Sequence, residues 1–104
     1  MIRISVGGLM DEADPEMEAK LRSVLDAETA DRDMGYHHLR CRNSGRAQWA
    51  EVHLVFADDV SVKRAHRLAT EIEGEIAKVL GSGSRVISHL EPRSEEATDE
   101  AWEI

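Results

Sequence analysis

The pattern of helical and strand segments along these 104 residues predicts an α+β fold with the element order α-β-β-α-β. Two observations carry the prediction. Two segments have apolar residues at helical spacing, and each is followed by strand-like alternation of apolar and polar residues. The length supports one compact domain.

The first helix is expected to begin at residues 14–16, where Asp14 can cap it and Pro15 suits its first turn. An apolar stripe follows at helical spacing, and the pattern ends near Ala30. The stripe consists of Met17, Leu21, Val24 and Leu25.

Residues 36–42 and 49–56 are expected to be two strands of a hairpin, joined by a turn in which Gly45 can adopt a positive φ. Alternation turns His38 away from His37, and it gives Cys41 the parity of Leu39, which predicts a buried thiol. On the second strand, alternation separates Val52, Leu54 and Phe56 from Trp49, Glu51, His53 and Val55.

The second helix is expected from its N-cap Ser61 to about Leu80, before Gly81. The third strand covers residues 85–91 and ends at Pro92. The buried stripe of the helix is expected to be Val62, Ala65, Leu68, Ala69, Ile72, Ile76 and Val79. The strand has Val86, Ser88 and Leu90 on one face, and Ile87, His89 and Glu91 on the other.

The simplest packing of these elements is a ferredoxin-like sandwich, a three-stranded sheet with both helices on one face. The sheet face that the helices do not cover is then exposed to solvent or paired with a second copy of the chain. This face carries His53, His89 and Glu91. Imidazole and carboxylate groups are good ligands for zinc and other divalent ions. His66 is expected at the edge of the second helix, within reach of the sheet margin, whereas a lone exposed histidine such as His38 is usually only a surface residue.

Composition narrows the class of function. The formal net charge of −8 argues against nucleic-acid binding and favours a cationic partner. Cys41 is the single cysteine, so an intramolecular disulfide is excluded and a reducing, cytoplasmic compartment is expected. The apolar stretch at the N-terminus is too short to span a bilayer. No catalytic triad is readable, and we expect no enzyme.

Four motifs lie in order between Gly35 and Pro92: HHLRCR, AEVHLVF, RAHRLA and SHLEP. This run resembles the C-terminal cytoplasmic domain of cation diffusion facilitator (cation efflux) metal transporters. By the resemblance, residues 1–13 are similar to the linker after the last transmembrane helix, and residues 14–92 to the metal-binding dimerisation domain. Residues 93–104 remain as an acidic, mobile tail, in which Trp102 is unexplained.

The resemblance implies a V-shaped homodimer with divalent-metal sites near its interface. The implied ligands are His37, His53, His66, His89 and Glu91, and the implied secondary or outer neighbours are His38, Glu51 and Cys41. Zinc is the expected ion, with iron, manganese, cobalt and cadmium as alternatives. The family commonly has aspartate at the positions of Glu91 and His38, and a small or hydroxyl residue at that of Cys41, which leaves the metal preference open.

The function implied is that of a regulatory homodimerisation domain that closes on binding a divalent metal at the cytosolic face of a cation efflux transporter. Its further partner would be the transmembrane domain of that transporter, and no nucleic acid is expected. One alternative is a free-standing cytosolic metal buffer or chaperone with the same ligands. Another is a small-ligand regulatory dimer of the same fold.

Overall fold

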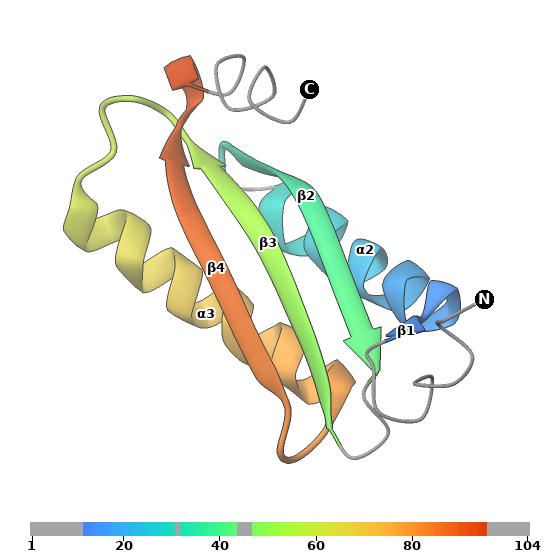
Figure 1. Cartoon of the computed structure of the whole chain (residues 1–104). Coiled ribbons are helices and arrows are strands. Elements are labelled where there is room, and N and C mark those ends of the chain that lie inside the picture. Colours follow the sequence, from blue (N-terminus) through green and yellow to red (C-terminus); the bar gives the residue numbers. More distant parts are fainter. Residues whose placement is uncertain (1–11, 31, 44–46, 96–104) are drawn as a thin grey trace.

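The computed structural model describes residues 12–30, 32–43 and 47–95 (Figure 1). It confirms the expected order of two helices and three main strands. A two-residue strand and a single 3-10 turn are added at the two ends. In chain order the elements are β1 (Glu12–Ala13), α2 (Pro15–Ala30), β2 (Met34–Asn43), β3 (Gln48–Phe56), α3 (Val62–Leu80), β4 (Arg85–Pro92) and the 3-10 helix η1 (Arg93–Glu95).

The sheet has the strand order β1-β2-β3-β4. Strands β2 and β3 are antiparallel, as expected for a hairpin, whereas β4 runs parallel to β3 because α3 carries the chain back along the sheet. Both helices lie on the same side of the sheet (Figure 1). We call the opposite side the open face, since no helix in the described residues covers it.

Both predicted helix starts are confirmed by their caps. The Asp14 carboxylate accepts a hydrogen bond from the Met17 N–H at 3.0 Å, and the Ser61 hydroxyl accepts one from the Arg64 N–H at 3.1 Å. Helix α3 ends at Leu80 and is capped by Gly81, whose φ of 98° favours glycine. These local contacts fix where each helix starts, and therefore which of its residues face the sheet.

The core lies between the sheet and the two helices. Its fully buried side chains come from α2, β2, β3 and α3 and include Leu21, Leu25, Cys41, Val52, Leu54, Ile72 and Ile76. The expected burial of Val62 is wrong, because this side chain is 84% exposed. Val62 is the first residue of α3, and helical side chains tilt towards the N-terminus, so it projects past the helix start rather than onto the sheet. The edge strand likewise leaves Leu90 39% exposed.

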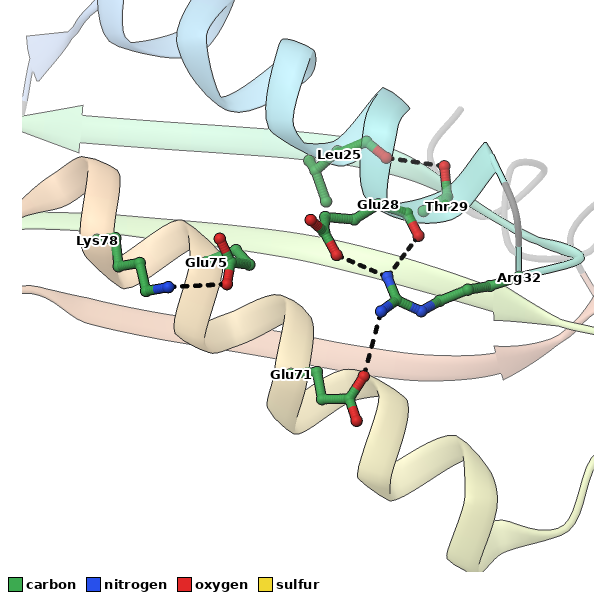
Figure 2. Close-up of polar contacts among 7 residues, drawn as sticks. All are labelled: Leu25, Glu28, Thr29, Arg32, Glu71, Glu75 and Lys78. Atoms are coloured by element: carbon green, nitrogen blue, oxygen red, sulfur yellow. Dashed lines mark hydrogen bonds and ion pairs between the residues drawn. The ribbon is translucent and has the colours of Figure 1, made fainter.

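Arg32 joins the C-terminal end of α2 to α3 (Figure 2). Its guanidinium donates to the backbone carbonyl and the carboxylate of Glu28, both at 2.6 Å, and to the carboxylate of Glu71 at 3.3 Å. Close by, the Thr29 hydroxyl donates to the Leu25 carbonyl at 2.8 Å. The contacts of Arg32 therefore link the two helices over the covered face of the sheet.

Several expectations concern residues outside the described part of the chain. They are the turn with Gly45, most of the linker (1–11) and most of the acidic tail (96–104), including Trp102. Within the described residues, no helix combines the length and the apolar character needed to cross a membrane.

Candidate metal centre

The register of the sheet lines up three histidines from three strands. His37 of β2 pairs with His53 of β3, and His53 pairs with His89 of β4. Side chains that are paired across neighbouring strands project from the same face of a sheet. The imidazoles therefore form a row across the open face, which is the face predicted for His53 and His89.

The first group of ligand atoms consists of His37, His53 and Glu91. One carboxylate oxygen of Glu91 lies 2.9 Å from His37 Nε2, and the other contacts His53 Nδ1. The three ligand atoms lie within 4.8 Å of one another. The side chains are largely shielded from water, with exposed fractions of 13% for His37 and Glu91 and 18% for His53.

The second group consists of Glu51, His53 and His89, again with ligand atoms within 4.8 Å of one another. His89 Nε2 lies 2.7 Å from a carboxylate oxygen of Glu51, and the rings of His53 and His89 are stacked with centroids 4.6 Å apart. This group is more open to water, since the His89 side chain is 47% exposed. Arg40 Nη1 lies 3.9 Å from Glu51.

A β-bulge brings a fourth imidazole to the row. The pairing of β2 with β3 shifts between His37 and Arg40, so two residues of β2 stand opposite the single residue Val52. The first of the two, His38, has a φ of 54°. Its ring centroid lies 4.1 Å from that of His37 and 5.0 Å from that of His53.

The prediction that His38 turns away from His37 is therefore wrong. It assumed strict alternation along β2, and the extra residue of the bulge breaks that alternation. The break is visible in the sequence: the inward residues change from even positions, Met34 and Tyr36, to odd positions, Leu39 and Cys41. That change of parity was the signal for a bulge between them.

Two of the expected site residues lie elsewhere. His66 is exposed on α3, and among the described residues it belongs to neither group. Cys41 is 1% exposed on the covered side of the sheet, where its thiol donates to the Asp14 carbonyl at 3.7 Å. Burial raises the pKa of this thiol. These observations fit the buried structural thiol that the strand parity predicts.

The donor set fits a divalent cation. Each group offers two imidazoles and one carboxylate, which is a common set for zinc with a fourth position left for another ligand. Bonds of about 2.0–2.2 Å to a tetrahedral ion place ligand atoms roughly 3.3–3.6 Å apart. Ligand atoms already within 4.8 Å can thus close around an ion by small side-chain rotations.

Comparison with known proteins gives a consistent result. Residues 13–93 match the family model of the cation efflux protein, cytoplasmic domain. The manganese efflux system protein MneP of Bacillus subtilis (strain 168) is 30% identical over 97 residues, which make up 92% of this chain and 32% of that protein. The cation-efflux pump FieF of Salmonella arizonae is 33% identical over 91 residues, 86% of this chain and 29% of the pump. This chain thus spans about a third of the length of these curated relatives.

Solved structures agree with the sequence match. CzrB in its zinc form is 34% identical with a TM-score of 0.71, and the match covers 84% of this chain and 98% of that chain. The metal-bound C-terminal domain of the CzcD transporter from Thermotoga maritima is 26% identical with a TM-score of 0.58, over 72% of this chain and 90% of that chain. The resemblance read from the four motifs is thereby confirmed: the chain belongs to the family of cytoplasmic domains of cation efflux proteins.

Proposed function

We propose that this chain is the metal-sensing cytoplasmic domain of a cation efflux transporter, and that it binds divalent cations at the two groups of the open face. The observation that carries the proposal is the convergence of two imidazoles and one carboxylate in each group. Burial strengthens the first group as a site, because the attraction between the Glu91 carboxylate and a cation is stronger where both are shielded from water. The family is one of cation efflux proteins rather than of enzymes.

The ion proposed is zinc. Imidazole and carboxylate suit zinc, and they also suit iron, manganese, cobalt and cadmium. The names of related proteins support more than one of these, since MneP is a manganese efflux protein and CzrB is known in a zinc form. Selectivity among such ions follows site geometry and metal availability more than ligand type.

The proposed working unit is a homodimer. Ile87, on the same face of β4 as His89, is 40% exposed and gives the open face an apolar side chain that a second copy could cover. His66, which is exposed on α3 and apart from the other ligands of its own chain, is proposed to complete a site of the second copy. A ligand from a partner would link ion binding directly to the dimer arrangement.

The charge of the chain supports the proposed closure on metal binding. Two copies with a formal charge of −8 each repel one another, and a bound divalent cation lessens that repulsion where the copies meet. The ion favours the closed dimer to the extent that it binds that state better, by about 1–3 kcal/mol in typical couplings. The transmembrane part of the transporter would sense this change.

Calorimetric titration of the metal-free protein with zinc at pH 7.5 tests the site. The His53→Ala/His89→Ala variant should lose the saturable binding that the native protein shows. The Glu75→Ala/Lys78→Ala variant, which removes an exposed ion pair on α3, should bind like the native protein. Absence of binding by the native protein, or binding that the histidine variant retains, would contradict the proposed site.

Small-angle X-ray scattering tests closure separately. The proposal predicts a smaller radius of gyration for the zinc-loaded dimer than for the metal-free dimer. Identical scattering profiles from a protein that demonstrably binds zinc would remove the closure mechanism while leaving the metal site in place.

A further inference from the structure

An apolar pocket lies between the C-terminal end of β4 and the N-terminal end of α3, which meet at the same end of the sheet (Figure 1). Its volume is about 410 Å³, within the range of roughly 300–1,000 Å³ found for pockets that hold small ligands. It therefore has room for an aromatic side chain. Its apolar lining consists of Phe56, Val60, Val62, Ala65, Leu90 and Pro92.

The rim of this pocket is open to water, although its floor is buried. Val62 is 84% exposed and Leu90 is 39% exposed, whereas Phe56 and Ala65 are exposed by 4% and 8%. A single exposed apolar side chain needs no explanation. Here, however, two of them border one concave apolar surface, and no described residue covers it.

Three cations follow Val62 at the start of α3, namely Lys63, Arg64 and Arg67. All three are exposed, and none of them has an ion-pair partner among the described residues. The first turn of α3 also contains no acidic residue. Cations are unfavourable at a helix N-terminus, and like charges four residues apart, such as Lys63 and Arg67, repel one another. An acidic segment placed beside this turn would therefore be stabilising.

The segment that follows η1 has the matching composition. Residues 96–104, EATDEAWEI, contain four acidic residues, no basic residue and one large aromatic side chain, Trp102. They lie outside the described part of the chain. An aromatic residue among acids suits a surface that combines an apolar pocket with neighbouring cations.

The chain enters this segment at the edge of the pocket. Pro92 lines the pocket, and so does Asp58, whose carboxylate accepts a hydrogen bond from the Ser94 N–H at 3.0 Å. Only eight residues separate Ser94 from Trp102, a distance of at most roughly 26–29 Å when fully extended. A tether this short loses little entropy when it folds back on its own starting point.

We propose that residues 96–104 fold back onto the same chain and that the indole of Trp102 occupies the pocket. The ring covers Val62 and Leu90, and the neighbouring acids of the segment face the cations at the start of α3. Asp58 supplies an acceptor for the indole N–H, which usually finds a hydrogen-bond partner when it is buried. This docking requires neither a metal ion nor a second copy of the chain.

Tryptophan fluorescence of the full chain, with a chelator present, tests the docking. The sequence has two tryptophans, so the Trp49→Phe background leaves only the signal of Trp102. In that background Trp102 should emit at a shorter wavelength than free tryptophan and should be protected from quenching by acrylamide. Val62→Asp should abolish both effects, because it places a carboxylate on the rim of the pocket.

The Val62→Asp variant is expected to fold, because position 62 is exposed and aspartate is favourable in the first turn of a helix. A circular-dichroism melt checks this. Ser82→Asp adds the same charge at an exposed position beyond the other end of α3, and it should leave the fluorescence of Trp102 unchanged.

The cations are tested separately. In the Trp49→Phe background, Lys63→Gln/Arg67→Gln should increase the quenching of Trp102 by acrylamide, because the acids beside the indole lose their partners. Lys78→Gln/Arg85→Gln removes two exposed cations at the opposite end of α3 and the start of β4, and it should have no such effect.

Three outcomes would overturn the proposal: equal quenching of Trp102 with and without Val62→Asp, no difference between the two pairs of Gln substitutions, or protection of Trp102 that disappears on dilution of the protein. The last result would assign the pocket to a segment of a second copy. None of these measurements includes zinc, so failure of the docking and failure of the proposed metal binding are distinguishable.

Discussion

The bulge in β2 gives a sharp test of the structure, because it holds His38 at a φ of 54°. Residues other than glycine pay about 1–2 kcal/mol in this left-handed region. We consider His38→Gly and His38→Ala together. Both remove the imidazole, so the difference between their stabilities reports the backbone alone.

The magnitude follows from two opposing terms. In the middle of a strand, glycine is less stable than alanine by about 0.5–1 kcal/mol, because the unfolded glycine chain has more freedom to lose. At position 38 glycine has this entropic disadvantage, but it lacks the larger left-handed penalty that alanine has. His38→Gly should therefore be more stable than His38→Ala by about 0.5–1 kcal/mol. Arg40 is exposed in the same strand beyond the bulge, and there Arg40→Gly should be less stable than Arg40→Ala.

Comparing the glycine–alanine stability difference at position 38 with that at position 40 removes the contribution of the unfolded chain's entropy, which is the same at both positions. The glycine–alanine difference should shift by about 1–2 kcal/mol between position 40 and position 38, with a change of sign. Urea denaturation in the presence of a chelator, at one fixed protein concentration, measures it. If His38→Gly is less stable than His38→Ala by the same amount as at Arg40, the bulge is absent, and His38 faces away from the other imidazoles.

Three further predictions follow from the packing. Ile76→Ala should lower the free energy of unfolding by about 2–5 kcal/mol, because this side chain is fully buried, whereas Val62→Ala should change it by less than about 0.5 kcal/mol; similar losses in urea denaturation would contradict the assigned stripe. Arg32→Met should lower the free energy of unfolding by about 1 kcal/mol, because it removes the bonds that link the end of α2 to α3. Lys78→Met breaks only an exposed ion pair and should lower it by about 0.3 kcal/mol; thermal melts in which Lys78→Met is the less stable variant would refute the link. Burial raises the pKa of Cys41, so its folded thiol should react slowly with a thiol reagent at pH 8; fast labelling of the folded protein would show that the thiol is accessible. The contribution of Cys41 to the free energy of unfolding should be constant below the unfolded-state pKa of about 8.5 and fall as the pH rises above it, a fall that Cys41→Ala should remove.

The helices and their caps were predictable because their signals are local. Asp14 and Ser61 bond to N–H groups three residues away, and the apolar spacing that follows them is set by the helix itself. The face of His53, His89 and Glu91 was predictable for a similar reason. Within one straight strand, alternation decides which residues share a face.

Features that depend on pairing between strands could not be predicted in the same way. The opposition of His37 and His53 depends on the register of β2 with β3, which alternation alone leaves open. The approach of His38 depends on the bulge. Strand β1, with two residues, is too short to leave a pattern, and it forms because β2 offers it an edge. The burial of Val62 was predicted wrongly because the helical spacing of apolar residues does not show whether a residue at the end of the helix still lies over the sheet.

Anomalous diffraction from zinc-soaked crystals tests the central claim most directly. The account predicts an anomalous peak on the open face within bonding distance, about 2.0–2.2 Å, of His37, His53 and Glu91. A fully loaded crystal with zinc bound only at other places, and with these three side chains still contacting one another without an ion, would contradict it.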